Sequence, residues 1–174
     1  MPFTRIRPGE LRHVAVPALV VWLLAFLPFL LVGEPSEMMR LQLAGSESQA
    51  RAIVSGWTPS EVVDMAYLQG IDAVHPLAYG IVLAAAAVWA GRRFRGRAAR
   101  WAAVIVWMPV AAAVFDTLEN IGMIVMIRGD TSAPIPMITT TFAVAKFSMF
   151  IVVAPYVVSA WVANLRGRRA VRAT

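Results

Sequence analysis

Four long apolar stretches, divided by short polar or basic segments, dominate the pattern of hydrophobic and polar positions along this chain. They cover roughly residues 13–33, 59–90, 101–127 and 137–162. A helix of about 20 residues crosses the ~30 Å hydrocarbon core of a bilayer, so each stretch is long enough to span a membrane. The pattern predicts an all-α membrane protein: residues 1–174 form one domain, a four-transmembrane-helix bundle that ends in a basic tail, residues 163–174.

The first stretch follows basic residues, which raises the alternative of a cleaved signal peptide. Its apolar run is longer than the ~7–15 residues usual for such a peptide, and no small-x-small cleavage site follows it. We therefore expect a retained helix.

The segment between the first two stretches carries two short amphipathic patterns, residues 36–43 and 46–55, each typical of a helix at a membrane interface. Thr58, Pro59 and Glu61 then form a capping box with proline at the first helical position, which predicts the start of the second spanning helix. We expect a partly helical loop that either covers a site as a lid or only connects two helices.

Basic residues gather at one set of helix ends, and the segments between the other ends carry most of the acidic residues. This distribution follows the positive-inside rule, so we expect both termini in the cytoplasm, an extracytoplasmic loop between helices 1 and 2, and a location in the plasma (inner) membrane. It also accounts for the net charge of +6 without nucleic-acid binding. The basic clusters are Arg5, Arg7 and Arg12, then Arg92, Arg93, Arg95, Arg97 and Arg100, then Arg166, Arg168, Arg169 and Arg172.

Composition supports this assignment, because 59% of residues are hydrophobic and only 15% are charged. The chain has no cysteine, which excludes disulfide exchange, thiolate catalysis and cysteine-ligated metals.

Polar side chains inside three of the spans are the candidates for function, because ionisable groups in hydrocarbon are costly and normally face the bundle interior. Within each span they recur at intervals that place them on one helix face, and the charged ones, Asp72, Asp116, Glu119 and Lys146, lie roughly eight to eleven residues below the predicted outer ends. One buried polar cluster in the outer half of the membrane is therefore predicted. Its members are Gln69, Asp72, His75 and Tyr79 in the second span, Asp116, Glu119 and Asn120 in the third, and Thr139 and Lys146 in the fourth.

Pro76 lies beside this cluster, within the stretch GIDAVHPLAYG. A proline cannot donate a hydrogen bond to the carbonyl four residues earlier, which here belongs to Asp72. We expect a continuous helix that is kinked at Pro76 and leaves the Asp72 carbonyl free for protein, water or a ligand.

The residue types point to acid–base chemistry. Three carboxyl groups face one lysine and one histidine, so we expect either a neutral carboxyl or a bound cation. The predicted catalytic residues are Asp72, His75, Asp116, Glu119 and Lys146, and the predicted substrate-binding residues are Asn120, Tyr79, Gln69 and Thr139. The acids and His75 could also ligate a divalent metal, but the nearby lysine disfavours a cation, so neither a metal nor another cofactor is predicted.

Three classes of function fit this cluster. The first is binding or conversion of an amphiphilic, lipid-like substrate by isomerase, cyclase or hydrolase chemistry, none of which needs a thiol or a redox cofactor. The second is a proton- or cation-coupled transporter, which with only four helices would act as a homodimer. The third is a non-catalytic structural or accessory membrane subunit whose buried charges fix helix register.

Overall fold

The computed structural model describes residues 8–32, 35–92, 94 and 96–172, and these residues form helices and short connections without a strand. Helices account for 87% of the structure. They are α1 (Pro8–Val32), α2 (Pro35–Gln42), α3 (Glu47–Ser55), α4 (Pro59–Asp72), α5 (His75–Gly91), α6 (Gly96–Ile105), α7 (Met108–Ile127) and α8 (Ile135–Arg172).

Four helical segments are long and apolar enough to cross a membrane, as the sequence predicts. They are Gly9–Leu31, Pro59–Gly91, Gly96–Ile127 and Ile135–Ala163. The last helix continues to Arg172, so the basic tail is helical over most of its length. Of the basic residues that led us to expect this orientation, Arg5, Arg7, Arg93 and Arg95 lie outside the described residues.

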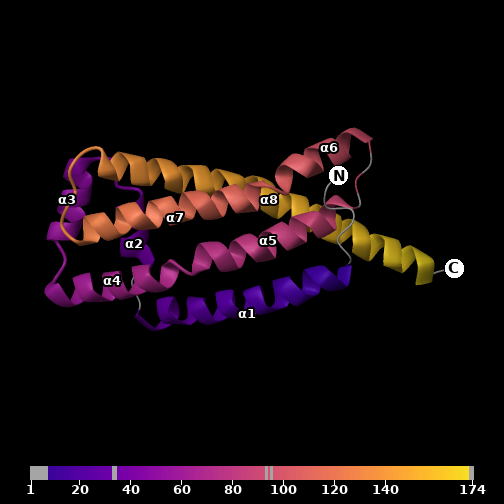
Figure 1. Cartoon of the computed structure of the whole chain (residues 1–174), viewed down its shortest axis with the longest axis horizontal. Coiled ribbons are helices and arrows are strands. Elements are labelled where there is room, and N and C mark those ends of the chain that lie inside the picture. The colour runs from indigo at the N-terminus through magenta and orange to yellow at the C-terminus, as the bar shows by residue number, and fades with distance from the viewer. Residues whose placement is uncertain (1–7, 33–34, 93, 95, 173–174) are drawn as a thin grey trace.

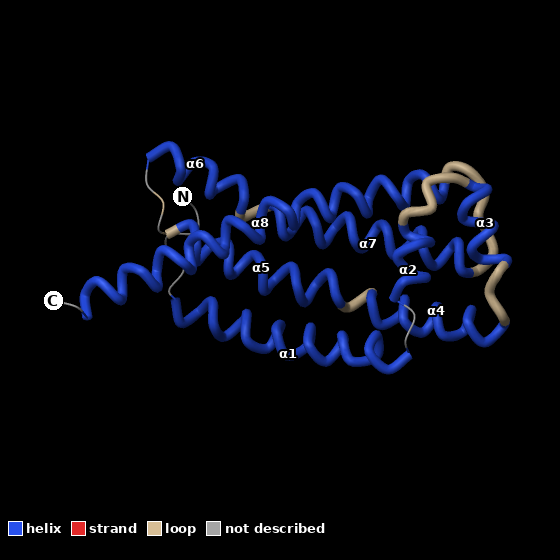
Figure 2. The backbone as a smooth tube through the Cα atoms, turned by 180° about the vertical axis from the view of Figure 1, so that it is seen from behind, coloured by secondary structure: helices blue, strands red, loops and turns tan. Residues whose placement is uncertain are grey.

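The second span is not the continuous kinked helix that the sequence suggested. It is interrupted at residues 73–74, here called the helix break, and Figure 2 shows the interruption as a loop between α4 and α5. The α4 helix closes with a tight turn in which Val74 N donates to the Ile71 carbonyl at 3.0 Å. Pro76 then falls in the first turn of α5, where a missing N–H costs no intrahelical bond. The proline thus starts a new helix instead of bending an old one.

The third span is divided in the same way, which the sequence analysis did not anticipate. The α6 and α7 helices separate at residues 106–107, and Pro109 lies in the first turn of α7.

The bundle is built around α7 and α8, which lie side by side along most of their length, with α5 against both and α1 outermost (Figure 1). Small residues allow the closest approaches. A Cβ atom at Gly122 of α7 would come within 2.0 Å of the Thr139 hydroxyl on α8, and one at Gly80 of α5 would come within 3.0 Å of Ala113 on α7. Ala18 alone is buried among the described side chains of α1, so this helix presents apolar surface nearly all round.

The arginine-bearing ends of α1, α6 and α8 meet at one end of the bundle, which we call the arginine end (Figure 1). The predicted short helices, α2 and α3, are present at the opposite end and do more than connect two spans. They form a cap that shares one hydrophobic core with α4 and α7. That core contains Met38, Leu41, Ala44 and Ala50 of the cap with Met65, Leu68, Met123, Met126 and Ile127 of the bundle.

Polar contacts fasten the cap to α8. The Thr140 hydroxyl donates to the Gln42 carbonyl at 3.0 Å and accepts from Gly45 N at 2.9 Å. Gly45 has a φ of +68°, a left-handed conformation that suits glycine at the turn between α2 and α3.

Within the cap, Glu37 joins Arg40 and also accepts from the Trp57 indole at 3.3 Å. The hydrogen bond from Arg40, followed by that from Trp57, lowers the pKa of the Glu37 carboxyl below its ordinary 4.5. Beyond the cap, α4 begins with the predicted capping box, in which Thr58 Oγ1 accepts from Glu61 N and Glu61 accepts from Thr58 N.

Candidate functional site

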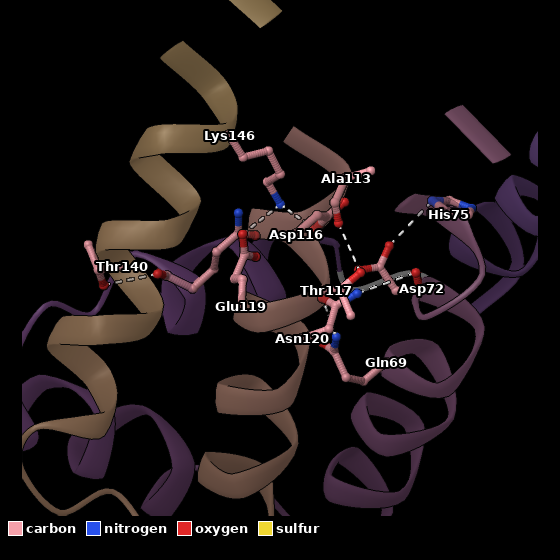
Figure 3. A network of polar contacts seen from close by, with 11 residues as sticks. Gln69, Asp72, His75, Ala113, Asp116, Thr117, Glu119, Asn120, Thr140 and Lys146 are labelled. Carbon is pink, nitrogen blue, oxygen red and sulfur yellow. Dashed lines mark hydrogen bonds and ion pairs between the residues drawn. The ribbon is translucent and has the colours of Figure 1, made fainter. Parts of the chain in front are cut away.

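Lys146 of α8 is the only lysine of the chain, and it lies buried between two carboxyl groups of α7. Its Nζ is 2.8 Å from Asp116 Oδ1 and 2.7 Å from Glu119 Oε2 (Figure 3). The two acids are three residues apart on one face of α7, which is why a single ammonium reaches both. We call these three residues the lysine cluster.

The lysine cluster carries one more acid than base. Buried ions lose their hydration, and mutual attraction compensates only when every charge is well paired. Lys146 has hydrogen-bond geometry toward Asp116, whereas its contact with Glu119 Oε2 is an ion pair that lacks such alignment. One carboxylate oxygen of the cluster is therefore buried without a hydrogen bond from the described residues.

Two amide side chains link α7 to the end of α4. Gln69 Nε2 donates to Asn120 Oδ1 at 2.7 Å, and Asn120 Nδ2 donates to the Asp72 carbonyl at 3.4 Å (Figure 3). This is the carbonyl that Pro76 deprives of its usual helical donor. Its predicted need for a partner is met by Asn120, through a long hydrogen bond.

Asp72 and His75 face each other across the helix break. Asp72 Oδ1 is 3.3 Å from His75 Nδ1, and the Asp72 side chain is 21% exposed although its neighbours in the site are buried. The break itself supplies this geometry, since Asp72 is the last residue of α4 and His75 the first of α5. We call this pair the dyad.

Two aromatic rings of α1 enclose His75. The Phe29 ring centroid lies 5.2 Å and the Phe26 centroid 6.4 Å from the imidazole. The sequence does not predict this contact, because α1 is apolar all round and no periodicity identifies the face that packs on α5. His75 also interacts with the backbone of Ala25 in α1, although its buried Nε2 has no hydrogen bond of good geometry within the described part of the chain.

Tyr79 lies one turn below His75, buried with its ring edge-on to Phe150 at 5.2 Å. Its hydroxyl interacts electrostatically with Asp116 but makes no hydrogen bond of good geometry to any described residue. Thr139, by contrast, donates to the Ile135 carbonyl of its own helix at 2.9 Å and packs against Gly122. Thr139 thus lies in the α7–α8 contact.

The predicted single cluster is therefore two adjoining groups. The lysine cluster joins α7 to α8, the dyad lies at the helix break, and Asn120 connects them through the Asp72 backbone. Gln42 of the cap is a further buried polar residue, which the sequence analysis did not single out because it lies outside the spans. Among the described residues, no three histidine, aspartate or glutamate side chains converge as a metal site.

An apolar groove of about 320 Å³ runs between α1 and α5 toward the arginine end. Its walls include Val16 and Leu19 of α1 and Val82, Ala86 and Trp89 of α5. Val82 is seven residues after His75, so it lies on nearly the same face of α5, about 10 Å along the helix axis.

Comparison of the chain with protein-family models, curated proteins and solved structures finds no match.

Proposed function

We propose that this protein binds an amphiphilic, lipid-like molecule from within the membrane and acts on its polar end by proton transfer, as an isomerase, cyclase or hydrolase would. The dyad at the helix break is the observation that carries this proposal. It joins a carboxylate to an imidazole, the group that general acid–base catalysis uses most often, and its acid is partly exposed.

The other polar residues have supporting roles in this proposal. Asp72 orients His75, which moves the proton, and the lysine cluster supplies a fixed charge pattern beside the reacting group. Asn120, Gln69 and Tyr79 position the polar end of the substrate.

We further propose that the arginine end faces the cytoplasm, as the positive-inside rule favours, in a plasma (inner) membrane. The cap then faces outward, and the dyad lies in the outer half of the bilayer. A substrate would reach it sideways from the outer leaflet, past the exposed side chains of Val74 and Leu77.

Isotope incorporation tests the proposal for any lipid substrate. Purified protein in liposomes of a bacterial total lipid extract is incubated in deuterated water or in heavy-oxygen water, and the lipids are analysed by mass spectrometry. Isomerisation or cyclisation leaves deuterium on carbon, and hydrolysis leaves heavy oxygen in a product. We expect His75→Gln to reduce labelling at least ~100-fold, in line with loss of a general acid–base group.

His13→Gln is the matched control, because the exposed His13 is the chain's other histidine and lies on α1 near the arginine end. It should leave labelling unchanged. Absence of labelled lipid with the wild-type protein, or equal labelling by His75→Gln, refutes conversion at the dyad.

A structural or accessory role is the second candidate, and the lysine cluster favours it. Its ion pairs are buried and are shared by α7 and α8, which pack extensively on each other. Under this alternative, Asp116→Asn would weaken the fold or the association with a partner protein, and no lipid labelling would exist to be lost.

A further inference from the structure

We infer that the site selects amphiphiles whose polar end is a protonated primary amine. This inference rests on the proposed function, because it names the chemical class of the molecule that the dyad and the lysine cluster receive. Charge, hydrogen-bonding capacity and the shape of the α1–α5 groove each support it.

The charge balance favours a cation. Asp72, Asp116 and Glu119 can contribute three negative charges, against Lys146 and, when protonated, His75. The dyad is close enough to the lysine cluster to share its field, because Asn120 touches Asp72 and is adjacent to Glu119 in α7. A phosphate or sulfate headgroup would meet repulsion there, whereas a cation would complete the pairing of buried charges.

The unused hydrogen-bonding atoms favour a donor. Gln69 Oε1 is a buried acceptor that no described residue supplies with a hydrogen bond, and Glu119 Oε2 has only its ion pair with Lys146 at 2.7 Å. The hydroxyl of Tyr79, a residue only 6% exposed, lies toward Asp116 but has no hydrogen bond of good geometry to a described residue.

An ammonium group matches this set because it carries three N–H donors and no acceptor. A quaternary ammonium has the charge without the donors, and an alcohol has a donor without the charge. Unsatisfied buried polar groups cost free energy, so the ligand that supplies both should bind best.

The α1–α5 groove provides a place for the tail. It begins about two helical turns below His75 on the same side of α5, and its lining is mostly aliphatic, with the positively charged Arg12 toward the arginine end, where the end of the tail would lie. An alkyl chain lying in it would leave its amine at the helix break, beside the partly exposed Asp72 carboxylate. The charge of the headgroup and the position of the tail thus point to one kind of ligand for the groove, an alkyl amine.

Chain-matched amphiphiles test the inference on the whole protein in dodecyl maltoside micelles. Native mass spectrometry measures the apparent affinity for dodecylamine, dodecanol, dodecyltrimethylammonium, dodecyl sulfate and butylamine, at a pH where the amines are protonated. We expect dodecylamine to bind at least ten-fold more tightly than each of the other four. The wild-type comparison alone can overturn the inference, so it does not depend on any variant being stable.

Variants then locate the binding. Asp72→Asn should reduce the affinity for dodecylamine at least ten-fold, and Asp64→Asn should not change it. Asp64 is the matched control because it is an exposed aspartate on the same helix. Equal reductions by both variants would overturn the assignment, since they would show only general attraction of the amine to negative surface.

The outcomes separate this inference from the proposed function. If dodecanol binds as tightly as dodecylamine and both are lost in His75→Gln, amine selectivity fails and amphiphile binding at the dyad stands. Equal binding of dodecyltrimethylammonium or of butylamine overturns the role of the N–H donors or of the groove, respectively. If none of the four long-chain amphiphiles binds, both proposals fail.

Discussion

Lys146→Met is the sharpest perturbation of this fold, because it removes the only cation from a buried cluster and keeps an unbranched side chain of similar length. Asp116 and Glu119 would then lie buried on one face of α7 without an opposing charge. Breaking a buried ion pair by removing one partner typically costs 3–5 kcal/mol. Two carboxylates lose their partner here, so we expect a destabilisation of about 4 kcal/mol, within that range.

The assay is reversible unfolding in mixed micelles, titrated with dodecyl sulfate and followed by tryptophan fluorescence. Ser148→Met is the matched control, since it places the same side chain at an exposed position two residues further along α8. It should change the free energy of unfolding by less than about 0.5 kcal/mol.

Adding Asp116→Asn and Glu119→Gln to Lys146→Met removes the unpaired charges. Replacement of a whole buried ion cluster by uncharged groups is often neutral, so the triple variant should recover most of the lost stability. The reasoning is refuted if Lys146→Met unfolds with wild-type free energy, or if the triple variant is no more stable than the single one.

Three further perturbations have matched controls or a clear pH signature. Gly122→Ala would bring a Cβ atom against Thr139, which should cost about 1–3 kcal/mol of unfolding free energy in the same assay. Gly70→Ala has open space around it and should be neutral or stabilising. Equal effects of the two variants would contradict tight α7–α8 packing. Thr140→Val removes the two hydrogen bonds between this side chain and the cap and should speed amide hydrogen exchange in α2 and α3. Thr141→Val, whose exposed hydroxyl bonds only within α8, should not. The hydrogen bonds from Arg40 and Trp57 lower the pKa of the Glu37 carboxyl in the folded protein. The contribution of Glu37 to the free energy of unfolding is therefore complete above about pH 4.5 and is lost as the pH falls through the lower folded-state pKa. Indole fluorescence should report this acid transition, Glu37→Gln should remove it, and an unchanged transition in that variant would be evidence against the assignment.

The parts of the fold that depend on composition along one segment could be predicted from the sequence. Spans follow from apolar length, and the start of α4 follows from a local capping box. The contact of Lys146 with the acids of the third span was also predictable, because a lone buried cation must face the available anions.

Features that depend on packing between segments were not predictable in the same way. A proline such as Pro76 can bend a helix or begin a new one, and tertiary contacts such as that between Asn120 and Asp72 decide between them. The α1 sequence offers no polar face, so nothing in it selects Phe26 and Phe29 as neighbours of His75. The two cap helices likewise have the periodicity of interfacial helices. Their apolar faces are buried against the ends of α4 and α7, a contact that their own sequence does not specify.

The helix break also has a mechanical consequence. The two halves of the dyad belong to different helices, joined by only two residues, and the helix that carries Asp72 is linked at its other end to the cap by residues 56–58. The α4 helix is therefore a lever about 20 Å long, with the cap at one tip and the carboxylate of the dyad at the other. Because the cap and α4 share one hydrophobic core, a displacement of the cap would be carried along α4 to Asp72 and would change its distance from His75.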